Sequence, residues 1–424
     1  MKTRFLNLIL ALLLANTAYS QTTNHPISAG ASYANAEFYE LATDQTKSIA
    51  HSSWDIAFSI YGSTDGGIFI NEGSSYSGTA PKLYLVPNKT FADNITTTDF
   101  GDELSNDEME WSNGAFNSIK NPSSFADYGW GSYNMSNHKI EGTALYAIEL
   151  SNGSHKKITI DTLTGGTYYF RYADLDGSNL QQKSIVKSNF SGQTLAYFSF
   201  ATNATISGEP TTGWDWVFTR YSTTVYDVQG TPSSYPVGGI LTNRNVKVAL
   251  ADNIAPATVD VSNYTLTDDS LSTIGHDWKS YDFSQGWVVD ADRVYFIQTA
   301  DSNVYKIQFI DFRGSSTGQG TFTKTLLGKA TPIQQIKNTP FEQFNIFPNP
   351  ATNQVNVAFS LKSSQQSVQI SITNLLGVTV LTQEIAAHQG FHATIINTNN
   401  LASGNYILHV QTPTAIQSTK LSIQ

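Results

Sequence analysis

Short runs of alternating apolar and polar residues follow one another along most of the chain. Residues 157–160 read Lys-Ile-Thr-Ile, residues 168–172 read Tyr-Tyr-Phe-Arg-Tyr, and residues 304–310 read Val-Tyr-Lys-Ile-Gln-Phe-Ile. A two-residue period of this kind predicts half-buried β-strands. Clusters of Gly, Asn, Asp and Ser separate the runs, as at 174–178 and 314–318, and predict turns. No segment keeps a helical period, so the pattern predicts an all-β protein.

The pattern occurs twice along the chain. Residues 54–58, Trp-Asp-Ile-Ala-Phe, reappear as Trp-Asp-Trp-Val-Phe at 214–218, and Phe38 and Phe198 each precede the tryptophan by 16 positions. Three further matches follow in the same order: 66–71 with 238–243, 130–133 with 278–281, and 157–158 with 306–307. Ordered matches with drifting spacing indicate a tandem duplication whose loops differ in length. We predict a first copy at 21–183 and a second copy at 184–330.

The N-terminus and the amino-acid composition indicate an exported protein. Lys2 and Arg4 precede an apolar run over 5–15, and small residues follow at 18–20, so residues 1–20 are predicted to be a secretory signal peptide. The apolar run is shorter than a membrane-spanning helix requires. Cysteine is absent from the sequence, which excludes disulfides, thiol nucleophiles and cysteine-ligated metal sites.

Charge and motifs narrow the classes of function. The net charge is −10 and basic residues form no cluster, whereas phosphate backbones bind to concentrated positive charge, so we expect no nucleic-acid partner. The sequence contains no nucleophile elbow, zinc-binding His-Glu helix, phosphate loop or dinucleotide fingerprint. We therefore expect a binding protein and not an enzyme, although scattered carboxylates leave acid–base catalysis as a further alternative.

The end of the chain has a pattern of its own. Alternating apolar residues separated by turns predict a small immunoglobulin-like β-sandwich over 344–424, after a proline-containing linker at 331–343. Four motifs stand out in it: 347–351 (Phe-Pro-Asn-Pro-Ala), 374–377 (Asn-Leu-Leu-Gly), 401–406 (Leu-Ala-Ser-Gly-Asn-Tyr) and 419–423 (Thr-Lys-Leu-Ser-Ile). With these motifs the segment resembles the type A sorting domain of the type IX secretion system of Bacteroidetes.

That resemblance implies a route and a destination. The type IX secretion machinery would be a partner of this chain, and the sorting domain would be removed after export across the outer membrane. The rest of the protein would then be secreted or attached to the outer surface through a surface polysaccharide.

The two copies carry motifs of a second family. In the second copy these are 213–218 (Gly-Trp-Asp-Trp-Val-Phe), 239–243 (Gly-Ile-Leu-Thr-Asn), 277–281 (Asp-Trp-Lys-Ser-Tyr) and the strand pair at 293–312. With them the second copy resembles the HmuY-like secreted haem-binding proteins of Bacteroidetes, and the first copy carries looser versions of the same motifs. The resemblance implies two related β domains in tandem. Most of these motif residues are expected to be core anchors.

The resemblance also implies where haem would bind. In the family, two His or Met residues from separate loops hold the iron, and one of them lies five positions after the tryptophan matched by Trp130, which here is Met135. The corresponding residue of the second copy is Phe283, which cannot ligate iron. The first copy also has 24 more residues than the second ahead of this tryptophan, in the region of Met109, where the family's other ligand loop lies.

Met109 and Met135 are therefore candidate axial ligands of a haem in the first copy. Trp111 and Trp130 are candidate walls of the haem plane, and His138 is an alternative ligand; no metal other than haem iron is expected. Thioethers are soft donors that suit ferrous iron. Haem or a haem carrier would then be a partner. Methionine also fills gaps in cores, so the alternative is a surface-binding or adhesion β-protein of the same ancestry that binds no haem and has no catalytic activity.

Overall fold

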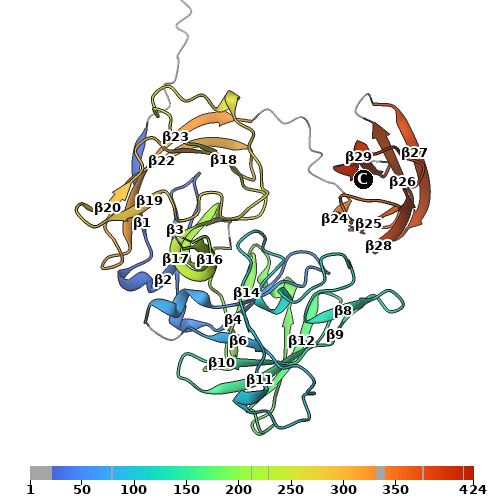
Figure 1. The fold of residues 1–424 in the computed structure, drawn as a ribbon, viewed down its shortest axis with the longest axis horizontal. Helices are drawn as coiled ribbons and strands as arrows, with labels where there is room; N and C mark the ends of the chain where they lie inside the picture. The colour runs from blue at the N-terminus through green and yellow to red at the C-terminus, as the bar shows by residue number, and fades with distance from the viewer. Residues whose placement is uncertain are drawn as a thin grey trace, which may run out of the picture.

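The structure is a computed structural model that describes residues 22–77, 80–211, 213–227, 229–330, 340–374, 377–413 and 415–424. The predicted signal peptide, and the predicted linker up to residue 339, lie outside the described residues. As predicted, the fold is all-β, with strands connected by turns and short 3-10 helices (Figure 1). No helix among the described residues is long and apolar enough to cross a membrane.

The first of two related β-modules, called the first module below, has a large and a small sheet. The large sheet contains β6 (Lys82–Leu85), β7 (Glu103–Leu104), β8 (Gly131–Asn134), β9 (Lys139–Gly142), β10 (Tyr146–Glu149), β11 (His155–Thr164), β12 (Thr167–Ala173) and β13 (Gln181–Val186). The small sheet has the order β15 (Ala204–Ile206), β14 (Leu195–Ser199), β4 (Ile56–Ser59) and β5 (Ile68–Ile70).

The second module has the same plan. Its large sheet has the order β1 (Thr23–Ser28), β23 (Gln319–Lys329), β22 (Asn303–Phe312), β21 (Val294–Gln298) and β18 (Lys247–Ala251). Its small sheet has the order β17 (Pro232–Thr242), β16 (Trp216–Tyr226), β2 (Asn35–Tyr39) and β3 (Thr46–Ala50). A separate hairpin of β19 (Lys279–Asp282) and β20 (Gly286–Val289) matches the β8–β9 hairpin of the first module.

Short 3-10 helices lie in the connections. They are η1 (Ala31–Tyr33), η2 (His51–Ser53), η3 (Glu72–Ser77), η4 (Thr97–Asp99), η5 (Ala115–Asn117), η6 (Lys187–Phe190) and η7 (Val261–Asn263). Of these, η2 lies on the crossing from β3 in the second module to β4 in the first, and η3 directly follows β5. Both border the site described below.

The two sequence copies exchange their first three strands. Strand β2 precedes β4 in the sequence, yet it pairs with β16 of the second copy, and β14 of the second copy pairs with β4 of the first. Strands β1 and β13 are exchanged in the same way, at β23 and β12. The second copy therefore starts at β13, which contains the boundary that we predict at 183/184. Each packed module nevertheless contains strands of both copies, so the modules do not coincide with the predicted domains.

The strand register corrects our alignment of the two copies by one residue. Phe198 pairs with Ile56, and Tyr39 pairs with Trp216. Ile56 and Trp216 both stand two positions after the repeated tryptophan, so the counterpart of Phe198 is Tyr39 and not Phe38. A shift of one residue moves a strand side chain to the other face of its sheet. Tyr39 and Phe198 accordingly belong to the cores of the two modules, and Phe38 belongs to the layer between them.

The aspartate of the repeated motif has the same role in both copies. Asp55 accepts a hydrogen bond from the backbone N–H of Phe200 at 2.7 Å, and Asp215 accepts one from the N–H of Leu41 at 2.6 Å. Each bond joins the two copies, because donor and acceptor come from different copies. The motif thus stabilises the strand exchange.

Burial of Asp215 gives a prediction for the pH dependence of stability. Burial raises the pKa of Asp215 from 3.8 to about 6. A carboxyl group with a raised pKa binds its proton more tightly in the folded state, so the free energy of unfolding falls as pH rises from about 4 to 6. Asp215→Asn should remove up to about 3 kcal/mol of that fall. Urea unfolding at several pH values measures it, with exposed Asp102→Asn as control; an unchanged pH slope in Asp215→Asn would contradict it.

The C-terminal segment forms the predicted β-sandwich. One sheet has the order β24 (Phe341–Phe347), β25 (Gln354–Leu361) and β28 (Gly390–Asn397). The other has the order β27 (Thr379–Ala387), β26 (Gln365–Asn374), β29 (Gly404–Gln411) and β30 (Ile416–Ile423). Its apolar residues form a core of their own. Phe391 lies 4.8 Å, between ring centroids, from Tyr133 of the β8–β9 hairpin.

Candidate functional site

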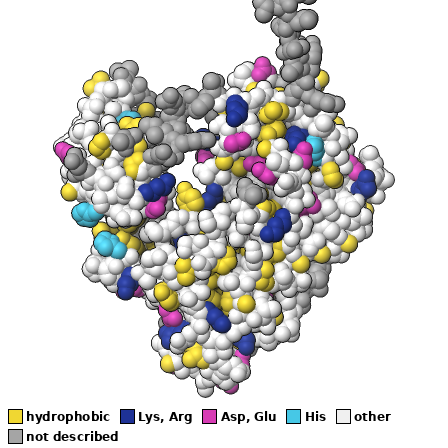
Figure 2. Space-filling view, turned by 180° about the vertical axis from the view of Figure 1, so that it is seen from behind, with side chains coloured by type: hydrophobic (Ala, Val, Ile, Leu, Met, Phe, Trp, Pro, Cys, Tyr) yellow, Lys and Arg dark blue, Asp and Glu magenta, His cyan; other side chains and the backbone are white. Residues whose placement is uncertain are grey.

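The small sheets of the two modules share one buried apolar layer. Phe38 of β2 and Val217 of β16 contribute to it from the second module, and Ala57 of β4 and Tyr197 of β14 contribute from the first. On the face shown in Figure 2, basic and acidic side chains are interspersed over the surface of both modules. The layer between the modules is therefore an apolar environment that residues of both modules build together.

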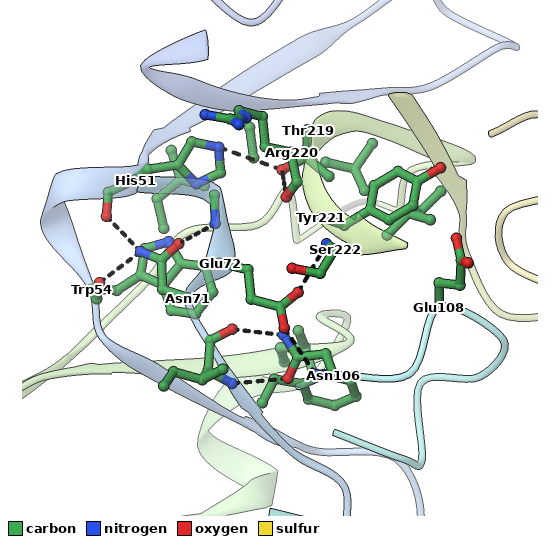
Figure 3. Close-up of a pocket in the computed structure, with 18 of the residues that line it drawn as sticks. His51, Trp54, Asn71, Glu72, Asn106, Glu108, Thr219, Arg220, Tyr221 and Ser222 are labelled. Carbon is green, nitrogen blue, oxygen red and sulfur yellow. Dashed lines mark hydrogen bonds between the residues drawn. The ribbon is translucent and has the colours of Figure 1, made fainter. Parts of the chain in front are cut away.

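A cavity of about 90 Å³ lies in this layer (Figure 3). Its apolar walls include Phe38, Ile49, Phe69, Trp111, Tyr197 and Leu241. Its polar lining includes His51, Asn71, Glu72, Asn106, Asp107, Glu108, Thr219, Arg220, Tyr221 and Ser222. Small-molecule sites commonly combine apolar walls with a few polar groups and lie where domains meet.

One side of the cavity is built from η2 and the start of η3. His51 of η2 is only 3% exposed, and a Cβ on Gly73 of η3 would lie 2.1 Å from its ring, so glycine is required there. The side chain of Asn71 donates to the carbonyls of His51 at 2.6 Å and Trp54 at 2.8 Å. Burial lowers the pKa of His51 to about 4, so the imidazole is neutral at pH 7.

Two residues at equivalent positions of the copies connect the modules. Glu72 accepts hydrogen bonds from the N–H groups of Asn106 at 2.9 Å and of Ser222, in the other module, at 3.0 Å. Arg244, which like Glu72 follows the repeated asparagine, forms a 2.8 Å ion pair with buried Asp65 of the first module. Burial raises the pKa of Glu72. These contacts hold the walls of the cavity in place.

Two residues that line the cavity carry a buried polar atom without a hydrogen-bond partner among the described residues. They are Trp54, with its Nε1, and Tyr221, with its hydroxyl. These atoms have almost no accessible surface, and Nε1 of Trp216 and of Trp278 in the core of the second module is unpaired in the same way, so they do not by themselves mark a ligand. Trp54 Nε1 can only donate, and the Tyr221 hydroxyl stays protonated because burial raises its pKa. The neutral imidazole of His51 can donate or accept.

The mouth of the cavity carries carboxylates. Asp107, Glu108 and Ser222 are partly exposed. Glu108 accepts a hydrogen bond from the hydroxyl of Thr223, and Asp107 accepts one from the side chain of Asn113 at 2.7 Å. Figure 3 shows His51 and Trp54 on one side of the cavity, Tyr221 and Glu108 on the other, and Glu72 between them.

The two methionines predicted to ligate haem lie on different elements. Met109 is 47% exposed and follows Glu108 in a loop. The backbone carbonyl of Met109 accepts a hydrogen bond from the N–H of Leu271. Met135 is 56% exposed and directly follows β8. Neither methionine lines the cavity between the modules or the second cavity described next. The haem ligation therefore stays a prediction.

The other predicted haem residues have separate surroundings. Trp130 is fully buried in the core of the first module, where its Nε1 donates to the carbonyl of Gly66 at 2.8 Å, so it is a core residue and not an open wall. Trp111 does line the cavity between the modules and donates to the carbonyl of Thr242 at 2.8 Å. His138 lines a second cavity, between the first module and the C-terminal sandwich.

Sequence reasoning did not select His51, Trp54 or Tyr221 as site residues. Trp54 belongs to the repeated motif, whose residues are expected to be core anchors. The sequence does not show that its indole N–H lacks an acceptor, whereas the indole N–H of its repeat, Trp214, donates to Glu209. The signal available in the sequence was the difference between the copies around this tryptophan: Glu209 precedes Trp214 by five positions, and Ile49 precedes Trp54 by five.

Comparison with known proteins identifies the C-terminal segment. Residues 345–424 match the family model described as "Secretion system C-terminal sorting domain". No curated protein matches the chain. Among solved structures, dimeric latent PorU from Porphyromonas gingivalis is similar over 68% of this chain and 31% of its own, with 9% identity and a TM-score of 0.18. The chain thus spans under a third of that protein, and so weak a likeness carries no argument.

The sorting domain settles the route of the protein. It indicates export by the type IX secretion system to the cell surface or the medium, with removal of the C-terminal domain. Residues 345–424 thus match the family of secretion-system C-terminal sorting domains, and this match indicates that the type IX secretion machinery handles the chain.

Proposed function

We propose that residues 22–330 are a non-catalytic ligand-binding module of HmuY-like ancestry that acts outside the cell. The observation that carries the proposal is the cavity between the modules, which combines apolar walls with several polar residues. The cavity carboxylates support binding rather than catalysis, because Glu72 accepts two backbone hydrogen bonds and Glu108 accepts one from Thr223.

The strand exchange supports the same proposal. The cavity is lined by β2, β3 and β16 of the second module and by β5 and β14 of the first, so it exists only where the two copies meet. A single copy could not form it. The duplication would thus have created a site that the ancestral domain did not have, while the repeated motifs kept their structural role.

The experiment fills the cavity and compares ligand binding. Ile49→Phe adds volume at a lining position, and Ile206→Phe is the matched control, because Ile206 packs in the same apolar layer without lining the cavity. Both variants of the mature protein are screened by thermal shift against a panel of small molecules that includes haemin. The proposal expects a ligand whose stabilising effect is lost in Ile49→Phe and retained in Ile206→Phe; a panel-wide absence of such a ligand would refute it.

Haemin serves a second purpose in that panel. A Soret shift that Met135→Ala abolishes and Ile49→Phe leaves intact would support the haem prediction for the first copy instead. Attachment to a surface polysaccharide after removal of the sorting domain is also a proposal, and mass spectrometry of the mature C-terminus from whole cells tests it.

A further inference from the structure

The C-terminal sandwich contacts the first module through aromatic side chains. The ring of Phe391, on β28, is stacked on that of Phe125 with the centroids 6.0 Å apart, and its centroid lies 4.8 Å from that of Tyr133 on β8. The ring centroid of Phe347, on β24, lies 5.4 Å from that of Phe125. Aromatic pairs at such distances attract one another beyond the effect of the area that they bury. The sandwich is therefore docked on the first module, and not only connected to it.

Phe391 points away from the core of its own sandwich. Successive side chains of a strand lie on alternate faces, and Ile396, five positions later on β28, is buried in the sandwich core, so Phe391 lies on the opposite face. There it packs against the hydrophobic core of the first module, as Phe125 does. A large apolar side chain on the outer face of a domain is typical of an interaction site.

The repeated hairpin indicates what this contact covers. Tyr133 is 6% exposed, whereas its repeat in the second module, Tyr281, is 56% exposed. Tyr281 lies beside rings of its own hairpin, Phe283 and Trp287, and Phe283 is itself 99% exposed. The two tyrosines have equivalent positions, and Tyr133 has a ring of the sandwich against it as well. Departure of the sandwich should therefore uncover Tyr133 and Phe125.

The contact between the sandwich and the first module is limited in extent. A polar contact, in which the hydroxyl of Thr64 donates to the side-chain oxygen of Gln343 at 2.7 Å, accompanies the aromatic ones. A cavity of about 320 Å³ remains between the two, lined by His138 on the first module and by His392 on the sandwich. A void in an interface forfeits contacts that its lining would otherwise make. The sandwich has a core of its own, so it can leave the first module without unfolding.

We propose that the sorting domain covers this surface of the first module in the precursor, and that cutting the linker is the step that uncovers it. A short linker gives a contact within one chain an effective concentration of about 1 mM, so a dissociation constant of about 100 µM already keeps roughly nine tenths of the chains docked. Once the linker is cut, that advantage is lost and the sandwich leaves at low protein concentration. The mature protein then has an aromatic surface, formed by Phe125, Tyr133 and the β8–β9 hairpin, that the precursor covers.

The test inserts the recognition sequence of a site-specific protease into the predicted linker of the full chain without its signal peptide. Hydrogen exchange is followed by mass spectrometry before and after cutting. We expect the amides of residues 124–142 to exchange up to about tenfold more slowly in the uncut chain, the ratio that follows from the two concentrations above. In the uncut chain, Phe391→Ser should raise the exchange to the level of the cut chain. Ile395→Ser is the matched control, because Ile395 lies on the same face of β28 and is 56% exposed.

Circular dichroism checks folding, and Phe125→Leu, which changes the contact from the first module, replaces Phe391→Ser if that variant unfolds. Equal exchange in the uncut and cut chains would overturn the inference, because the sandwich would then not be docked. Pieces that stay together and protected after cutting would overturn it too, since the linker would then not control the contact. A change in Ile395→Ser as large as that in Phe391→Ser would reject this contact as the cause. The ligand of the cavity between the modules is tested separately by Ile49→Phe.

Discussion

Cysteines placed at Asn24 and Thr323 will form a disulfide within one chain, whereas cysteines at Asn24 and Arg171 will not. Asn24 of β1 pairs directly with Thr323 of β23, although they lie at opposite ends of the duplicated region. Paired residues of antiparallel strands have Cα atoms about 4.5–5.5 Å apart, a separation that a disulfide spans. If the copies kept their own strands, β1 would instead lie beside β12, where Arg171 pairs with Gln182.

The chain offers a clean background for this experiment because it contains no cysteine. Non-reducing electrophoresis and mass spectrometry after mild oxidation measure the crosslink, and dilution separates bonds within a chain from bonds between chains. A disulfide that closes so long a loop should also stabilise the protein by about 2–4 kcal/mol. Crosslinking of the Asn24–Arg171 pair instead of the Asn24–Thr323 pair would show that the strands are not exchanged.

The exchange is also the part of the fold that the sequence could not predict. Alternating runs predicted strands, and the ordered motifs predicted a duplication, because both depend on local residues. The choice of partner does not: β2 and β14 carry equivalent residues, and either could pair with β4 or β16. The same equivalence explains the one-residue error at Phe198, because Tyr39 and Phe38 are both large aromatic residues and only the strand register distinguishes them.

The candidate site could not be predicted from the sequence for a related reason. The cavity joins η2, η3 and β16, and their contact depends on the exchange. Met109 and Met135 were predicted as ligands from their positions relative to the repeated motifs, yet both side chains are exposed on separate elements. Trp54 and Tyr221 are ordinary aromatic residues in sequence, and only the packing of the two modules places them at the cavity. The sorting domain was predictable because its motifs are contiguous.

Replacing Glu209 with alanine should cost at least about 4 kcal/mol of the free energy of unfolding. The carboxylate accepts four hydrogen bonds in a site without solvent exposure, and each buried donor left without an acceptor costs about 1–3 kcal/mol. Few single substitutions exceed that range. Glu209→Gln should fall between the wild type and Glu209→Ala, because its amide oxygen still accepts while its NH₂ group faces other donors.

Urea unfolding followed by tryptophan fluorescence measures these differences, with Glu141→Ala as the control because Glu141 is exposed and accepts hydrogen bonds from the side chains of Asn134 and Asn137. The control should change stability by less than about 0.5 kcal/mol. A loss below 1 kcal/mol in Glu209→Ala would mean that Trp214 and its neighbours do not depend on this carboxylate.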